Sequence, residues 1–274
     1  MTGAHSTWRA TKPVAAGMPD GRSLVGEPRP GPFPWLTAEL RGSWMETRTA
    51  KTLNFSVPGW TGHDAGQHVD IKLTAEDGYT AQRSYSIASA SAQGWLQLTV
   101  ETVSNGEVSP YLVETMEPGD KLQLRGPLGG WFRWTERLTE PVLLVGGGSG
   151  IVPLMAMLRQ RIQSGAATPF HLIYMARTPD HLFYANELHT LTQSHDDVTI
   201  DQLYSRSGLP DDSRPPGRLN LDDLPAPTEE PSAVSPRVYV CGPTGFVENA
   251  ARLLQARGHQ SDTIRTERFG PSGG

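Results

Sequence analysis

The chain has 274 residues, which is enough for two domains of ordinary size, each with its own hydrophobic core. Its net charge of −5 is dispersed over both signs, which argues against nucleic acid or an anionic membrane as the main partner. No apolar run reaches the roughly eighteen residues that a membrane span needs, and the N-terminus lacks the apolar core of a signal peptide. We therefore expect a cytoplasmic protein with no membrane span.

Cysteine and histidine usage argues against a metal centre. The single cysteine, Cys241, excludes an internal disulfide and a four-cysteine iron–sulfur cluster. Any metal-cluster chemistry must then take place on a partner. The scattered histidines lack the spacing of a zinc site: His63, His68, His181, His189 and His195.

Residues 1–34 are rich in glycine and proline, which predicts an extended or partly disordered tail. A first domain, placed at residues 35–136, follows with a strand-like pattern. Strands are expected over 38–45, 51–57, 68–73, 83–88, 95–103 and 121–125, with a short helix over 108–116. Several short strands at close spacing indicate an antiparallel barrel or sandwich.

A second domain, placed at residues 137–274, alternates strands with helices. Strands are expected over 142–145, 170–175, 198–204 and 238–240, and helices over 154–163, 182–193 and 246–257. This alternation predicts a parallel sheet with helices on both faces. The proline-dense stretch 207–236 is expected to be a mobile surface loop, and residues 265–269 either a final strand or a lid.

A glycine-rich turn joins the strand over 142–145 to the next helix. Glycines let the backbone come close to a ligand, and the unpaired N–H groups that begin a helix attract an anion. Gly148 and Gly150 match the dinucleotide fingerprint G-x-G-x-x-G, but Pro153 takes the place of the third glycine. Gly147 precedes these residues, and Ser149 offers a hydroxyl donor. By itself the turn could bind a dinucleotide or be purely structural.

Two motifs of the first domain could contact phosphate. Arg83-Ser84-Tyr85-Ser86 ends an expected strand, where an arginine fork can hold a phosphate or pyrophosphate. Strand alternation would place Tyr85 on the face of Arg83, although a lone tyrosine is more often a core or surface aromatic. The segment from Gly106 to Ser109 supplies a glycine turn and a serine that could cap a helix or help to bind phosphate.

The motif Cys241-Gly242-Pro243 follows the strand over 238–240. It would place the thiol at the carboxyl end of a parallel strand, where open α/β sheets bind their ligands. A lone buried cysteine is otherwise usually inert.

Taken in this order, the motifs resemble the ferredoxin-NADP reductase family of flavoprotein reductases over roughly residues 37–269. The resemblance implies an N-terminal antiparallel flavin-binding β-barrel, followed by a doubly wound parallel-sheet domain that binds nicotinamide. It implies hydride transfer from NAD(P)H to FAD, and onward electron transfer to a separate carrier such as ferredoxin or flavodoxin. No ferredoxin-like cysteine cluster is appended at either end, so we expect the reductase module alone.

The resemblance also assigns roles to residues. For FAD, or alternatively FMN, it implies that Tyr85 stacks on the flavin ring and that Ser86 lies near flavin N5. The implied flavin-binding set is Arg83, Ser84, Tyr85, Ser86, Gly106, Glu107, Val108, Ser109 and Phe269. The implied nicotinamide-binding set is Gly147, Gly148, Ser149, Gly150, Cys241, Gly242 and Pro243. The catalytic residues would be Ser86, Cys241, Glu267 and Phe269, with Cys241 and Glu267 beside the nicotinamide ring and Phe269 covering the other flavin face.

Three positions depart from the family pattern. Plant-type members carry cysteine where this chain has Val108, and Ser149 replaces a common threonine. Five residues follow Phe269, where several relatives stop at the aromatic residue.

The residues beyond the glycine turn bear on the choice of nicotinamide. NAD-type sites place a carboxylate about twenty residues beyond the turn, whereas NADP-type sites place an arginine nearby. Here the strand over 170–175 is followed by Arg177, and Ser205-Arg206 and Arg218 come later. This pattern favours NADPH over NADH. Two alternatives to a carrier reductase stay open: direct reduction of a ferric chelate or free flavin, and a flavin-binding regulatory subunit without turnover.

Overall fold

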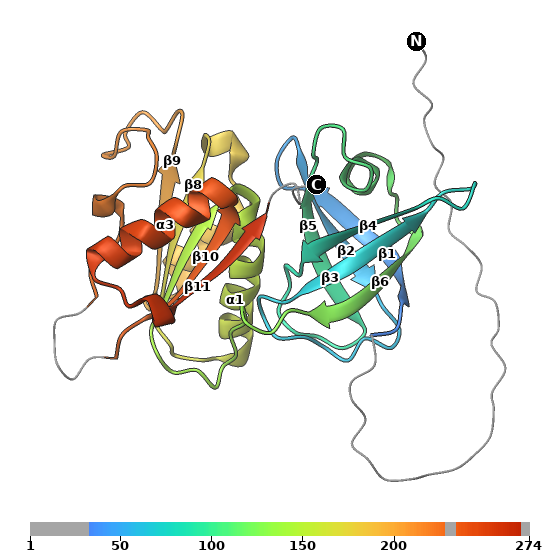
Figure 1. The fold of residues 1–274 in the computed structure, drawn as a ribbon, viewed down its shortest axis with the longest axis horizontal. Helices are drawn as coiled ribbons and strands as arrows, with labels where there is room; N and C mark the ends of the chain where they lie inside the picture. Colours follow the sequence, from blue (N-terminus) through green and yellow to red (C-terminus); the bar gives the residue numbers. More distant parts are fainter. Residues whose placement is uncertain (1–32, 228–233, 270–274) are drawn as a thin grey trace, which may run out of the picture.

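The computed structural model describes residues 33–227 and 234–269, which form a β-barrel beside an α/β unit (Figure 1). The expected tail, residues 1–34, lies outside the described residues except for its last two. No described helix is both long and apolar enough to cross a membrane.

The first unit is a six-stranded antiparallel sheet with the strand order β4-β3-β6-β1-β2-β5. Its strands are β1 (Leu36–Met45), β2 (Ala50–Ser56), β3 (His68–Thr74), β4 (Thr80–Ser86), β5 (Trp95–Glu101) and β6 (Lys121–Leu128). An antiparallel bridge between Ile87 and Leu98 joins the end of β4 to β5, so the two edge strands meet and the sheet curls into a barrel. Alternate residues of each strand, such as Leu53 and Phe55 of β2, fill the barrel core.

The helix expected over 108–116 is present over residues 109–115, nearly as predicted. Ser109 and Pro110 are helical and continue into a π-helical turn, η1 (Tyr111–Thr115), closed by a hydrogen bond from Met116 N–H to the Tyr111 carbonyl. Pro110 fits the first turn of this helix, and Pro118 and Gly119 follow its end. Leu112 and Val113 bury their side chains, which explains the apolar pattern.

The second unit is a parallel five-stranded sheet with the order β11-β10-β7-β8-β9. Its strands are β7 (Val142–Gly147), β8 (Phe170–Ala176), β9 (Val198–Tyr204), β10 (Arg237–Pro243) and β11 (Ile264–Phe269). Its helices are α1 (Ile151–Ser164), α2 (Ala185–Ser194) and α3 (Thr244–Arg257), with 3₁₀ turns η2 (Gly148–Gly150), η3 (Pro179–His181), η4 (Leu221–Asp223) and η5 (Ser261–Thr263). Residues 265–269 thus belong to a final strand.

Two hydrophobic cores cover the two faces of this sheet. Residues of α1 and α2 pack on the face that also meets the barrel, through Trp134 and Phe132. Residues of α3 pack on the opposite face with Val145 and Ile173. The doubly wound arrangement predicted from the strand–helix alternation is therefore confirmed (Figure 1).

The segment 207–236 is not wholly a surface loop, as the sequence suggested. Leu219 and Leu224 are buried against the α3 core, and η4 lies between them. Asn220 and Asp223 cap η4 reciprocally. Two apolar side chains among the prolines are thus enough to anchor the described part of this segment.

Candidate functional site

The end of β4 presents its side chains on two faces, as strand alternation predicts. Ser84 donates a hydrogen bond to Asp70 Oδ1 at 2.6 Å, and Ser86 is buried. On the other face, Arg83 is exposed and Tyr85 is half-buried against the barrel core. Burial raises the pKa of Tyr85, so its phenol hydroxyl stays protonated and uncharged.

A carboxylate that sequence reasoning missed fixes this strand end. Asp70 of β3 accepts hydrogen bonds from Ser84 and from Gln82, and it is ion-paired with Arg125 of β6 at 2.9 Å. Asp70 is nearly buried, so the three donors compensate the cost of removing its charge from water. The alternation of β3 places Asp70 on this face, but only the register between strands identifies its partners.

The turn from Gly106 to Ser109 lies beside Arg83. Glu107 is 3.4 Å from the Arg83 guanidinium, which joins the two predicted phosphate-binding motifs. Ser109 does not cap a helix: its hydroxyl accepts a hydrogen bond from Val103 N–H at 3.1 Å. Val108 is buried in the barrel core, so only its backbone is available to a ligand.

The glycine turn after β7 packs directly on the end of β10. A Cβ added at Gly150 would lie 2.2 Å from the Cys241 carbonyl oxygen, so only glycine fits there. Gly148 has φ +55 and open space around it, as an approach by a ligand requires. Ser149 lies between these two glycines, in the 3₁₀ turn η2. The turn therefore approaches β10 closely at Gly150 and leaves space at Gly148; the predicted approach to a ligand stays a prediction.

Phe246 is a site neighbour that sequence reasoning missed. Added Cβ atoms at Gly147 and Gly242 would lie 2.7 and 2.9 Å from its ring, so the ring fills the space beside both glycines. Pro243 precedes α3, and Phe246 lies in the first turn of that helix. An aromatic three residues after Pro243 was the available signal.

Residues from the two units meet at the carboxyl end of β10. Cys241 pairs in register with Glu267 of β11, and Ser86 Oγ lies 3.4 Å from Glu267 Oε1 across the domain junction. Burial raises the pKa of Glu267 to about 7, and the Ser86 hydroxyl acts in the opposite direction. Burial, and secondarily Glu267, raise the pKa of Cys241, so its thiol stays protonated. Three residues predicted for catalysis are therefore adjacent.

Phe269, the fourth residue of that set, pairs in register with Pro243. Its half-buried ring packs against the core that joins sheet and barrel. It lies on the same face of β11 as Glu267, two residues further along the strand.

The residues predicted to choose between nicotinamides gather at the ends of β8 and β9. Ser205 N–H donates to the Ala176 carbonyl, and Arg206 N–H donates to the Arg177 carbonyl, at 2.9 and 3.0 Å. Gly217, which precedes Arg218, donates to the Tyr204 carbonyl at 2.9 Å. Arg177, Arg206 and Arg218 are all exposed, and among the described residues none of their side chains takes part in an ion pair.

A polar network that the sequence did not reveal joins the barrel to the α/β unit. Arg159 of α1 donates to the Ala88 carbonyl of the barrel at 2.7 Å, and it is paired with Glu187 of α2 at 2.5 Å. Its guanidinium lies over the Tyr184 ring, 4.8 Å from the centroid. Tyr184 donates its hydroxyl to Thr99 at 2.6 Å, which is also a residue of the barrel.

The sequence matches two family models that together span most of the described chain. Residues 43–133 match the oxidoreductase FAD-binding domain, and residues 144–252 match the oxidoreductase NAD-binding domain. The chain belongs to the ferredoxin reductase family. The barrel is therefore the FAD-binding unit of the reductase, and the parallel sheet is its NAD-binding unit.

Curated relatives of the reductase include components of oxygenase systems. The reductase component of propane 2-monooxygenase from Rhodococcus jostii (strain RHA1) is 31% identical over 209 residues, covering 74% of this chain and 55% of the relative. The ferredoxin–NAD(P)(+) reductase component of naphthalene 1,2-dioxygenase/salicylate 5-hydroxylase systems from Ralstonia sp. is 29% identical over 233 residues, covering 84% and 65%. The chain thus spans between about half and two thirds of the length of these relatives.

Solved structures share the fold of the reductase. The FAD/NAD-binding domain of nitric oxide dioxygenase from Vibrio cholerae O1 biovar El Tor has a TM-score of 0.76 at 24% identity, covering 86% of this chain and 99% of that one. A ferredoxin NADP+ reductase from Neisseria gonorrhoeae has a TM-score of 0.70 at 21% identity, covering 85% and 98%.

Proposed function

We propose that this reductase transfers hydride from NAD(P)H to FAD and passes the electrons to a separate acceptor protein. The observation that carries the proposal is the meeting of Ser86 from the FAD-binding barrel with Glu267 and Cys241 from the NAD-binding sheet. Hydride transfer needs the two cofactor rings in contact, and this is where residues of both units converge.

The barrel residues fit a flavin nucleotide. Arg83 is exposed, donates to the Gln82 carbonyl at 2.7 Å and lies 3.4 Å from Glu107, which leaves further guanidinium donors for a phosphate. Tyr85 is half-buried, with its phenol neutral, as suits a ring that packs against an aromatic ligand. We assign FAD binding to these residues together with Ser84, Ser86 and the backbone of residues 106–109. When bound, the flavin would supply the chemistry that converts a two-electron donor into one-electron steps.

The sheet residues fit a nicotinamide nucleotide. Gly147, Gly148, Ser149 and Gly150 form a tight turn that leads into α1, with open space at Gly148 for a pyrophosphate. Glu267, with a pKa of about 7, holds or releases a proton at its carboxyl near neutral pH. Cys241 stays a neutral thiol, so it serves as a small contact surface rather than as a nucleophile. Phe269 lies on the same strand face and would limit access of water to the flavin.

The arginines at the ends of β8 and β9 support NADPH as the preferred donor. Arg177, Arg206 and Arg218 are exposed and could bind a 2′-phosphate together with Ser205, which precedes Arg206. For the acceptor, we propose a ferredoxin or flavodoxin. The proposal is supported by relatives that are named as reductase components of oxygenase systems.

An absorption spectrum tests the cofactor, and a comparison of acceptors tests the partner. We expect a yellow protein whose flavin bands bleach under anaerobic NADPH, and faster reduction of a ferredoxin or flavodoxin than of ferric chelate or free flavin. A colourless protein that takes up neither FAD nor FMN would overturn the proposal. Faster turnover with the small acceptors would instead identify a direct reductase, and flavin that NAD(P)H never bleaches would identify a regulatory subunit.

A further inference from the structure

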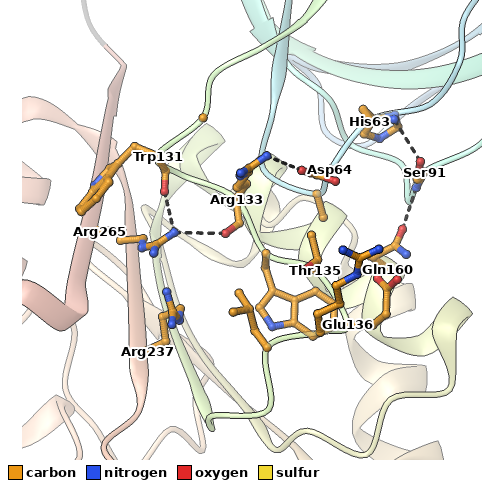
Figure 2. A pocket seen from close by; sticks show the side chains of 15 residues that line it. His63, Asp64, Ser91, Trp131, Arg133, Thr135, Glu136, Gln160, Arg237 and Arg265 are labelled. Carbon is orange, nitrogen blue, oxygen red and sulfur yellow. Dashed lines mark hydrogen bonds and ion pairs between the residues drawn. The ribbon is translucent and has the colours of Figure 1, made fainter.

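A cavity of about 560 Å³ lies at the domain junction and is lined by residues outside the proposed cofactor site (Figure 2). Its walls come from the barrel at His63 and Ser91, from the linker over 130–138, from Gln160 of α1, and from the strands β10 and β11. The volume falls in the range of small-molecule sites.

The charged groups of the cavity are mostly arginines. Arg133 is paired with Asp64, and Arg237 is paired with Glu140. Arg265 forms no ion pair with a described carboxylate. It donates to the linker carbonyls of residues 131 and 133 at 2.9 and 3.5 Å (Figure 2).

Arg137 adds a second guanidinium without a carboxylate partner. It lies in the wall, is exposed, and makes no side-chain hydrogen bond or ion pair with the described residues. Glu136 is the one wall carboxylate without an arginine partner in the part of the chain that the structure describes. Two guanidinium groups without a carboxylate partner and one carboxylate without an arginine partner thus line the cavity, and the balance of charge favours an anion.

Buried polar atoms without partners concentrate around this cavity. Of six such side-chain atoms among the described residues, three belong to residues that line it: Trp134 Nε1, Arg237 Nε and His63 Nδ1. Trp134 and Arg237 can only donate through these nitrogens. Unpaired buried donors are costly and call for an acceptor. These nitrogens are themselves buried from solvent, so the donors that a ligand meets in the cavity are the exposed guanidinium groups of its wall.

The strand register separates this cavity from the proposed cofactor site. Arg237 begins β10, and Arg265 pairs with Tyr239 near the beginning of β11, whereas Cys241 and Glu267 lie further toward the carboxyl ends. Arg265 and Glu267 project from the same face of β11, because they are two residues apart. The cavity therefore lies on the barrel-facing side of the same two strands, toward their amino ends.

We propose that this cavity binds a small organic anion whose carboxylate or phosphate group is held by Arg265 and Arg137. A guanidinium fork binds either group through paired charge-assisted hydrogen bonds. The cavity is larger than an inorganic ion needs, so the remaining volume accommodates an organic part. This inference does not depend on which acceptor the reductase serves.

Calorimetric titration of the FAD-loaded full chain tests this site, with NADP+ present at saturation so that the nicotinamide site is filled. Citrate and benzoate probe for a carboxylate ligand, and inorganic phosphate probes for a phosphate ligand. We expect at least one probe to bind, and to bind about tenfold more weakly or worse to Arg265→Lys and Arg137→Ala. Arg48→Ala, which removes an exposed arginine away from the cavity, should bind like the wild type.

Arg137→Ala is the decisive variant, because Arg265 also holds linker carbonyls and its replacement can loosen the fold. Unchanged binding to Arg137→Ala would overturn the site. So would the absence of heat with all three probes at millimolar concentration, or binding that appears only when NADP+ is left out.

Discussion

Glu267 combines partial burial with a position between Cys241 and Ser86, so its carboxyl titrates near neutral pH. Its pKa in the folded protein is about 7, above the ordinary value of 4.5. A raised pKa means that the folded state favours the protonated carboxyl. The contribution of this carboxyl to the free energy of unfolding is therefore fully present below pH 4.5 and is lost as the pH rises through 7. Relative to Glu267→Gln, the wild type should lose no more than about 3 kcal/mol of unfolding free energy over this window.

Urea unfolding of both proteins at about pH 5 and about pH 8 measures this difference. Glu248→Gln provides the matched control, because Glu248 is exposed on α3 and should leave the pH dependence of the wild type unchanged. Parallel pH profiles for the wild type and Glu267→Gln would show that the carboxyl titrates at its ordinary pKa.

Gly150 is constrained by contact rather than by a positive φ. An alanine Cβ there would lie 2.2 Å from the Cys241 carbonyl, so the turn must move away from β10. We expect Gly150→Ala to lower the free energy of unfolding by about 1–3 kcal/mol, as overpacked sites do. It should also weaken NAD(P)H binding, because the turn and the end of β10 would no longer meet.

Gly245→Ala is the control for this prediction. Gly245 lies in the first turn of α3 with open space around it, so alanine should be neutral or should stabilise the helix by up to about 1 kcal/mol. Chemical unfolding and titration with NADP+ compare the two variants. A Gly150→Ala variant as stable as Gly245→Ala would contradict the close approach.

The positions of some site residues in the fold could be predicted from the sequence, and those of others could not. The tight glycine turn and the position of Cys241 followed from a buried strand that ends in glycines. Ser109 and Val108 could not be placed, because a plausible capping serine looks the same whether it faces the next helix or the preceding loop. Asp70 was missed because its partners lie on two other strands.

At the level of elements, the ends of β8 and β9 gather the features that would set nicotinamide preference. If Arg206 binds a 2′-phosphate, Arg206→Ala should raise the Michaelis constant for NADPH by about tenfold or more. This factor corresponds to the free energy of one charge-assisted hydrogen bond. The constant for NADH should change little, because NADH lacks that phosphate. Steady-state assays with both nucleotides make the comparison.

Arg252→Ala is the matched control, because Arg252 is an exposed arginine on α3 whose side chain bonds only to Asn249 among the described residues. It should leave both constants unchanged. Equal effects of Arg206→Ala on NADPH and NADH would remove the basis for an NADPH preference.

The elements of the parallel sheet were easier to predict than those around them. The short apolar run of β7, which ends in glycines, is typical of a strand covered on both faces, and a glycine marks the C-cap of both α1 and α3. The helix that contains η1 was placed nearly correctly, but an apolar pattern does not reveal that its last turn is π-helical. The buried leucines near η4 were hidden in a proline-rich context.

For the whole molecule, the central question is how the two units keep Ser86 and Glu267 together. The polar network of Arg159, Glu187 and Tyr184 with the barrel lies at this junction. Tyr184 adopts φ +60, which is uncommon for a non-glycine residue, and its N–H donates to Glu46 of the barrel at 3.0 Å. Sequence reasoning could not find this network, because its contacts with the barrel join residues that are 62 to 138 positions apart.

Removing Arg159 should therefore loosen the whole molecule rather than one unit. Arg159→Ala leaves the Ala88 carbonyl and Glu187 without their donor, which should cost about 1–3 kcal/mol. We expect the thermal transition to broaden or to split into separate barrel and α/β transitions. FAD content should stay unchanged while the rate of flavin reduction by NADPH falls, because the rings would lose their fixed alignment.

Differential scanning calorimetry and stopped-flow absorbance measure the two effects, with Arg41→Ala as the matched control. Arg41 forms an exposed ion pair with Glu39 within the barrel alone, and such pairs contribute little. If Arg159→Ala matched Arg41→Ala in both measurements, the alignment of the two units would have to come from apolar packing of Trp134 and Phe132 against α1 and the sheet. If only the calorimetric transition changed, Arg159 would stabilise the junction without positioning the rings.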